Sequence, residues 1–344
     1  MTTAERTSAY VNEGLYRRQM TKVGLCMLLQ EILFFAPALL LQTLLYPVLE
    51  DLLSPVAAYT AEELLNGAQY LCAFFIPALI LRRSVVITEP MPYTPVVPGA
   101  IVWLVPAAIS MILAASVLNS LMMPTFYAAF SDEVLWNDAV SSNFQVVLTF
   151  ITTALIPGVC EEFLFRGAVY TAMRPFGRTT AIVGSAVLFG LMHANAGQFF
   201  YAFAAGVIFA LIREKTGSLW CGMLIHICNN AFSVVESALD ERLAPEVADM
   251  VLFAVDAFVF ILGILGVLML LRRMLAEKEK KIKAETEYTS NFGVILPSAP
   301  TYVPYPLERG RALRLSLTVP MVFFLVISVG RALLFLLEAA AMYA

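Results

Sequence analysis

The ten residues 158–167, GVCEEFLFRG, place two adjacent carboxylates and an arginine inside a segment that is apolar from Phe144 to Met173. A helix of this length crosses a bilayer, whose hydrocarbon core is about 30 Å thick. Charged groups at that depth are costly unless they are paired or take part in chemistry. The segment therefore predicts a membrane-spanning helix that carries a functional site.

Helical geometry separates the roles of these charges. Successive residues of an α-helix point about 100° apart, so Glu161 and Glu162 are not expected to face one centre. Glu162 and Arg166 are four residues apart on one face and are expected to pair. This leaves Glu161 as the spare carboxylate. The chain has two histidines, His193 and His226, each in a later apolar segment, and we expect both to converge with Glu161 on one intramembrane centre.

Composition places the chain among polytopic membrane proteins. Of its 344 residues, 60% are hydrophobic and 14% are charged, whereas soluble domains are about 45–50% apolar. The net charge of −4 and the scattered basic residues argue against a nucleic-acid partner. The five cysteines lie in expected spans without paired loop spacing, so we expect buried, reduced thiols.

Apolar runs predict an all-α bundle of about nine transmembrane helices. They lie near residues 24–48, 64–81, 98–119, 145–173, 179–195, 198–213, 218–238, 250–271 and 316–340. Lys and Arg precede the first run and follow the second, fourth, sixth and eighth, whereas Asp and Glu dominate the other loops. Because basic residues favour cytoplasmic loops, we expect a cytoplasmic N-terminus and an external C-terminus.

The expected helices divide the chain into six regions. They are a cytoplasmic N-terminal segment (1–23), three transmembrane helices (24–143), a catalytic core of four helices (144–240), the eighth helix (250–272), a cytoplasmic polar linker (273–315) and the ninth helix (316–344). The lysine-rich start of the linker is expected to continue the eighth helix. We expect a solvated spacer there; binding of anionic lipid headgroups is the alternative.

The expected helix directions give each polar residue a depth. With a rise of about 1.5 Å per residue from the cytoplasmic helix ends, Glu161 lies about 18 Å deep, His193 about 21 Å, His226 about 12 Å and Asn230 about 18 Å. All four fall within the central half of the hydrocarbon core. Residues from three separate helices are therefore expected at similar depth.

Three motifs in successive membrane segments carry a family resemblance, and they are Glu161-Glu162-x-x-x-Arg166, Phe189-x-x-x-His193 and His226-x-x-x-Asn230. In this order they resemble the CPBP (Abi) family of intramembrane proteases, which includes CAAX prenyl endopeptidases and bacteriocin-immunity homologues. The resemblance covers residues 145–238. It implies an integral protein of a bacterial cell membrane that hydrolyses a peptide bond of a membrane-anchored or lipidated, CAAX-like substrate. Its partners would be membrane lipid and that peptide or protein substrate.

The residue chemistry fits this reaction. Hydrolysis needs a base that activates water and donors that stabilise the oxyanion. Glu161 is the expected base, since a low-dielectric setting disfavours the charged form of a carboxylate. His193 is expected to share or orient the water. His226 and Asn230, four residues apart on one helical face, are the expected donors.

The supporting residues have structural roles in this interpretation. The pair of Glu162 and Arg166 is expected to hold the fourth helix in place, and Phe189 is expected to pack beside it. Pro157 and Gly158, just before the motif, are expected to kink the helix and admit water.

No cofactor is certain, although zinc is a candidate. Glu161, His193 and His226 match the ligand set of a catalytic zinc site, but the compact HExxH pairing is absent. If zinc took all three, Glu162 would have to be the base and would lose its pair with Arg166, so we favour a metal-free glutamate mechanism. Two other functions remain open: a non-catalytic membrane immunity or scaffold protein, and a proton-coupled transporter.

Overall fold

The computed structural model describes residues 3–85, 98–122, 142–292, 307 and 310–342. Within these ranges the chain folds into helices and contains no β-strand. Parts of the expected 24–143 region and of the 273–315 linker lie outside the described residues. The helices are, in chain order, α1 (Thr3–Leu40), η1 (Leu41–Leu45), α2 (Tyr46–Leu52), α3 (Pro55–Ser84), α4 (Pro98–Met122), α6 (Asn143–Thr149), η2 (Phe150–Leu155), α7 (Ile156–Glu162), η3 (Phe163–Val169), α8 (Tyr170–Met173), η4 (Arg174–Phe176), α9 (Arg178–Met192), α10 (Ala196–Thr216), α11 (Leu219–Arg242), α12 (Pro245–Phe292), α13 (Arg311–Ser316) and α14 (Val319–Met342).

The expected all-α membrane bundle is confirmed. The nine apolar runs are mostly helical, and the run that carries the motif forms one continuous helical stretch from α6 to α8, hereafter the motif helix. Residues 193–195 of the fifth run and 317–318 of the ninth run lie outside the helices. Six helical segments of the described chain are long and apolar enough to cross a membrane, while α9 and the Val319–Leu334 part of α14 are apolar but shorter. The number of crossings therefore stays a prediction.

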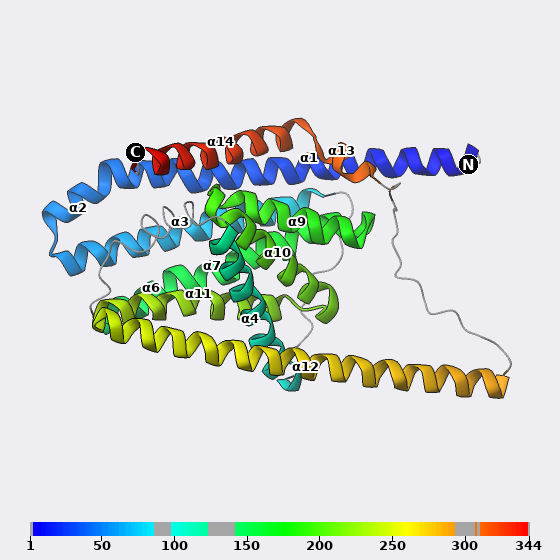
Figure 1. The fold of residues 1–344 in the computed structure, drawn as a ribbon. Helices are drawn as coiled ribbons and strands as arrows, with labels where there is room; N and C mark the ends of the chain where they lie inside the picture. The colour runs from blue at the N-terminus through cyan, green and yellow to red at the C-terminus, as the bar shows by residue number, and fades with distance from the viewer. Residues whose placement is uncertain (1–2, 86–97, 123–141, 293–306, 308–309, 343–344) are drawn as a thin grey trace.

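The bundle has two outer sides with the motif helix between them. In Figure 1, α1 and α14 lie side by side along one side and α12 runs along the other. Gly24 allows the approach of α14 to α1, since a Cβ atom there would lie 2.6 Å from the backbone nitrogen of Met321. The lysine-rich residues that follow the eighth apolar run continue α12 as expected.

Contacts along the motif helix fix the direction of α3. Near one end, the hydroxyl of Thr152 donates a hydrogen bond to Glu63. Near the other, Nη1 of Arg82 donates to the carbonyl of Gly167 at 2.7 Å. Residue numbers rise together along both helices, so the two run parallel, as the basic residues at the end of each predict.

The helix α11 runs in the opposite direction. Asn230 Nδ2 donates to the carbonyl of Thr153 at 3.3 Å, while Gly158, further along the motif helix, meets the earlier residue Ile227. This antiparallel arrangement also agrees with the alternation of loop charges. The side of the membrane on which the N-terminus lies stays a prediction.

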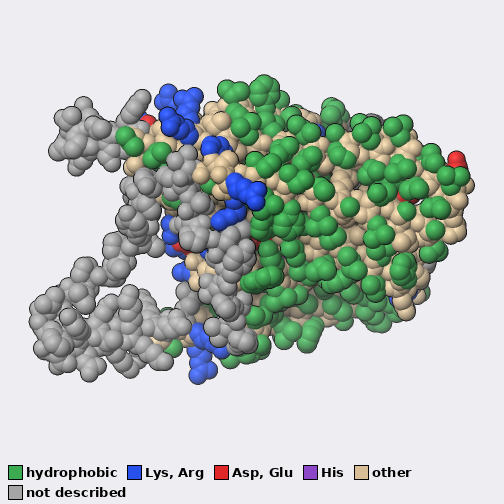
Figure 2. Space-filling model, turned by 180° about the vertical axis from the view of Figure 1, so that it is seen from behind, with side chains coloured by type: hydrophobic (Ala, Val, Ile, Leu, Met, Phe, Trp, Pro, Cys, Tyr) green, Lys and Arg blue, Asp and Glu red, His purple; other side chains and the backbone are tan. Residues whose placement is uncertain are grey.

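The surface is that of an integral membrane protein. Large hydrophobic side chains are exposed on most of the long helices, and Figure 2 shows them covering much of one face, with Lys and Arg gathered toward one end. Contacts also join basic segments of separate helices: Arg174 pairs with Glu214 at 2.8 Å, and Lys22 donates to the carbonyl of Ser84. An apolar belt with a basic end is what a bilayer and its cytoplasmic surface require.

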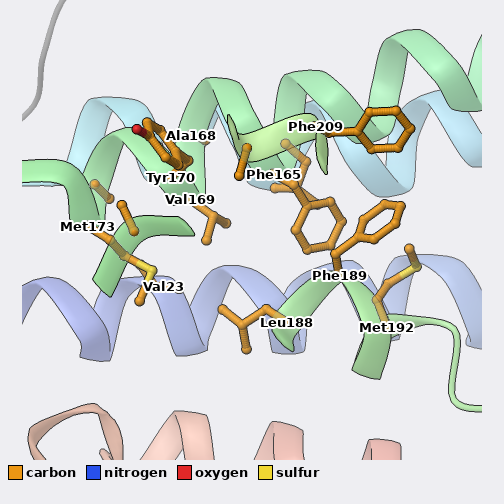
Figure 3. Close-up of a cluster of buried hydrophobic side chains, with 14 of the residues drawn as sticks. Val23, Phe165, Ala168, Val169, Tyr170, Met173, Leu188, Phe189, Met192 and Phe209 are labelled. Atoms are coloured by element: carbon orange, nitrogen blue, oxygen red, sulfur yellow. The ribbon is translucent and has the colours of Figure 1, made fainter. Parts of the chain in front are cut away.

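The motif helix, α9 and α10 contribute a large part of the buried core. Figure 3 shows Phe165, Phe189 and Phe209 close together, one from each of these elements. The rings of Phe165 and Phe189 meet edge to face with centroids 5.1 Å apart. Aromatic packing of this kind fixes the spacing of helices, and here it holds those that carry the motifs.

Candidate active site

The motif helix is irregular on both sides of the two glutamates. Its α-helical part α7 lies between the π-helical segments η2 and η3. Pro157 stands in the first turn of α7. The kink expected at Pro157 and Gly158 stays a prediction, and the π turns lie on either side of these two residues. Such turns occur often at functional sites.

Arg166 and Glu162 form the expected pair. Nη1 of Arg166 lies 2.7 Å from Oε1 of Glu162, and both side chains are completely buried. Nη2 donates to the carbonyl of Gly206 at 2.9 Å, and the guanidinium lies over the rings of Phe189 and Phe209 at 4.6 and 5.0 Å. One arginine thus ties the motif helix to α9 and α10.

His226 lies between the two adjacent carboxylates. Its Nε2 is 3.7 Å from Oε2 of Glu161, and its Nδ1 is 3.4 Å from Oε1 of Glu162. Helical spacing predicts that only Glu161 faces the centre, yet Glu162 also lies close to His226. The two ring nitrogens of an imidazole lie on different edges, so one ring can contact two carboxylates that point in different directions.

Two glycines allow α11 to come this close. A Cβ atom on Gly158 would lie 2.6 Å from Cγ1 and 2.9 Å from the backbone nitrogen of Ile227. A Cβ atom on Gly222 would lie 2.7 Å from Oε2 of Glu162. Gly158 thus serves the packing of α7 on α11, a role that the sequence analysis did not assign to it.

His193 stands where α9 ends. The expected helix through residue 195 stops at Met192, and Ala194 adopts a left-handed φ of 49°. Asn195 then caps α10, its side chain accepting hydrogen bonds from the backbone nitrogens that follow. Nδ1 of His193 lies 2.8 Å from the carbonyl of Phe189, which leaves Nε2 free of that contact.

Asn230 is part of a polar group on α11. Its Nδ2 donates to Thr153, and its Oδ1 accepts from Nδ2 of Asn229 at 3.2 Å. Nδ2 of Asn229 also lies 2.9 Å from the hydroxyl of Tyr201. The sequence analysis missed Asn229 and Tyr201; a second amide directly beside Asn230 in a membrane segment was the available signal.

Tyr70 on α3 is the most important residue that the sequence analysis missed. Its hydroxyl donates a hydrogen bond to Oε1 of Glu161. A tyrosine hydroxyl in an apolar segment usually finds a polar partner. That general expectation gives no means of choosing Glu161 as the partner from sequence.

The expected residues meet at one cavity of about 680 Å³. Glu161, His193, His226 and Asn230 all line it, together with Phe189. Glu162 and Arg166 lie behind this lining. Three further acidic residues on α3, α11 and α12 also line the cavity, and they are Glu63, Glu236 and Asp256.

The arrangement of donor side chains bears on the zinc hypothesis. Across the described residues, no three His, Cys, Asp or Glu side chains lie close enough together to hold a metal ion. Glu161 and His226 are neighbours, but His193 does not complete a ligand set with them. The residues as placed do not fit a zinc site, and we derive no step through zinc.

Comparison with known proteins points to one family. Residues 143–232 match the family model described as type II CAAX prenyl endopeptidase Rce1-like. A relative in Bacillus subtilis (strain 168), named "Putative membrane peptidase YdiL", is 27% identical over 93 residues, which are 26% of this chain and 37% of the relative. The chain thus matches little more than a third of that relative. No solved structure matches the chain. The matched segment contains all three motifs.

Proposed function

Because residues 143–232 belong to the CPBP family of membrane proteases, we propose that this chain is an intramembrane endopeptidase. Its substrate is a membrane-anchored or lipidated, CAAX-like peptide or protein. One observation carries the proposal: Glu161, His193, His226 and Asn230, from three separate helices, line a single cavity inside an apolar belt. Such polar groups are costly in a membrane unless they have a function.

Glu161 is the proposed base. It takes a proton from water, and the resulting hydroxide attacks the carbonyl carbon of the scissile peptide bond. The tetrahedral oxyanion then collapses, the carbon–nitrogen bond breaks, and the proton held by Glu161 passes to the leaving amine. The carboxylate is thereby regenerated, and water has been added across the peptide bond.

The other polar residues of the cavity orient the attacking water and stabilise the oxyanion. With its Nδ1 beside the Phe189 carbonyl, His193 has Nε2 available to orient the attacking water. The amide of Asn230 and the imidazole of His226 are the proposed donors to the oxyanion. In this assignment His226 has a second contact, with Glu162, which restrains the ring before substrate binds.

Glu162, Arg166 and Phe189 support the site from behind. The buried ion pair and the rings beneath it join the motif helix to α9 and α10. Catalytic geometry depends on such supporting contacts, since a displacement of about 1 Å can cost a hundredfold in rate. We assign no substrate contact to Glu162 or Arg166.

A proton-coupled carrier is the second candidate function. It is favoured by Glu63, Glu236 and Asp256, which line the same cavity as Glu161 and add carboxylates from three helices. Buried carboxylates in series form proton relays in transporters. A carrier needs these acids, whereas the proposed peptidase needs Glu161 above all.

Cleavage of membrane-anchored peptides in detergent tests the proposal. We expect wild type to cleave at least one member of a panel that includes lipidated and unmodified peptides, and Glu161→Gln to lose that activity. Glu236→Gln, a neutral substitution on the wall of the same cavity, serves as the matched control and should retain most of it. Equal cleavage by wild type and Glu161→Gln would refute the mechanism.

A chelator arm addresses the metal question. Because the candidate ligands do not assemble into a zinc site, we expect cleavage to continue after treatment with a strong chelator. Loss on chelation with recovery on added zinc would overturn the metal-free mechanism while leaving the protease assignment intact. Proton uptake by wild-type proteoliposomes without any cleavage would favour the carrier.

A further inference from the structure

We propose that Tyr70, on a helix outside the segment that matches the protease family, is a positioning residue for Glu161. The proposal rests on the proposed function, in which Glu161 is the base. Tyr70 lies on α3, whereas the family match begins at residue 143. Its hydroxyl donates to Oε1 of Glu161, and its side chain lines the cavity.

The two oxygens of Glu161 have different neighbours. Oε1 accepts the hydrogen bond from Tyr70, while Oε2 lies 3.7 Å from Nε2 of His226. A carboxylate without such a bond rotates about its terminal torsion, which is broad and nearly two-fold. The bond from Tyr70 fixes this torsion, so that Oε2 is the oxygen presented toward His226 and the attacking water.

The Tyr70 ring is itself held firmly. It stacks on Phe74 with centroids 4.4 Å apart and planes 5° apart. Phe34 of α1 meets the same ring edge to face, with centroids 5.4 Å apart. The hydroxyl is therefore placed by aromatic packing that does not depend on Glu161, so Tyr70 determines the position of the carboxylate.

The helix that carries Tyr70 is also fixed to the motif helix. One turn before Tyr70, a Cβ atom on Gly67 would lie 3.2 Å from Cδ1 of Ile156, so side chains of the motif helix pack directly on α3 there. Further along, Arg82 is hydrogen-bonded to the carbonyl of Gly167. Contacts on both sides of Tyr70 keep α3 in register with Glu161.

A positioning role predicts a specific kinetic result. The Tyr70 hydroxyl is occupied by Glu161, so its removal should leave substrate binding nearly unchanged and slow the chemical step. A fall in kcat without a matching rise in KM is therefore the expected result.

The test compares Tyr70→Phe with Tyr59→Phe. Tyr59 lies on the same helix, and its hydroxyl is hydrogen-bonded to Thr149 Oγ1 at 2.6 Å, so the control also removes a phenol that is bonded to a partner on the motif helix. For Tyr70→Phe we expect kcat to fall about tenfold to a hundredfold and KM to change less than about twofold. Tyr59→Phe should keep the wild-type kcat and KM.

A spectroscopic measurement makes the result independent of turnover. The infrared difference between Tyr70→Phe and wild type should contain a shifted carboxylate band that disappears when both carry Glu161→Gln. Absence of this band, or a wild-type kcat in Tyr70→Phe, overturns the inference while the protease assignment stands. If wild type cleaves no peptide, the proposed function fails, and the infrared band still decides whether Tyr70 controls Glu161.

Discussion

Nδ1 of His226 lies 3.4 Å from Oε1 of Glu162, the carboxylate that helical spacing assigns to Arg166. The same Glu162 oxygen lies 2.7 Å from Nη1 of Arg166. One carboxylate therefore links a structural arginine to a histidine that also faces the proposed base, Glu161. Supporting and catalytic groups are in direct contact, so changes in the buried pair should affect both stability and rate.

Neutralising Glu162 should destabilise the protein strongly. Glu162→Gln leaves the fully buried Arg166 guanidinium without its charged partner, which typically costs about 3–5 kcal/mol of unfolding free energy. The double variant Glu162→Gln/Arg166→Met removes both charges and should lose less than the sum of the single variants. Reversible denaturation in detergent measures these differences. Additive losses would show that the two side chains are not energetically coupled.

Substituting Gly158 should separate the motif helix from α11. The added methyl group of Gly158→Ala meets the backbone of Ile227, which does not move as a flexible side chain does. Overpacking of this kind costs about 1–3 kcal/mol, and cleavage should fall because His226 moves with α11. Gly330→Ala is the control, since a Cβ atom there has no neighbour within 4 Å. Equal thermal stability and activity of the two variants would contradict the close approach.

Phe189 should matter more for turnover than for substrate affinity. Its ring lies 5.1 Å from the ring of His193 and 5.9 Å from that of His226, and it supports the Arg166 guanidinium. Phe189→Leu keeps an apolar side chain but loses the flat surface, so kcat should fall about tenfold. The exposed Phe200 provides the control Phe200→Leu. A change confined to KM would place Phe189 in substrate binding instead.

The ninth helix should depend on an ion pair between α1 and α14. Nη1 of Arg331 lies 2.9 Å from Oε2 of Glu31, whose side chain is 3% exposed. Arg331→Met leaves Glu31 buried without this partner, at a cost of about 1–3 kcal/mol. The control is Arg272→Met, at an exposed position on α12, which should leave the melting temperature in detergent unchanged. An equal fall in melting temperature for both variants would argue against a stabilising ion pair between Arg331 and Glu31.

The local features of the fold follow from the sequence. Apolar runs give the helices, because a backbone in lipid must satisfy its hydrogen bonds within each segment. The spacing of Glu162 and Arg166 gives their pair, because residues four apart share a helical face even though a π turn intervenes. The alternation of loop charges gives the relative directions of α3, the motif helix and α11.

The helix ends and the close helix contacts that shape the site were harder to predict from the sequence. The turn after His193 requires a left-handed Ala194 and a capping Asn195, and an apolar run does not show where such a break falls. His193 consequently stands at a helix end instead of inside a span. The approach of α7 and α11 at Gly158 was likewise invisible, because a glycine in a sequence does not indicate which neighbour needs the space.

By itself, the sequence determined that this chain is a helical membrane protein with costly polar groups in three motif segments. Spacing along one chain is set by covalent geometry, so contacts within a helix can be read from it. Only the tertiary structure decided that His226 lies between both glutamates and that Tyr70 holds Glu161. Such contacts join distant segments. They depend on how closely the helices approach and on how π turns rotate their residues, and neither can be derived from the spacing of residues along the chain.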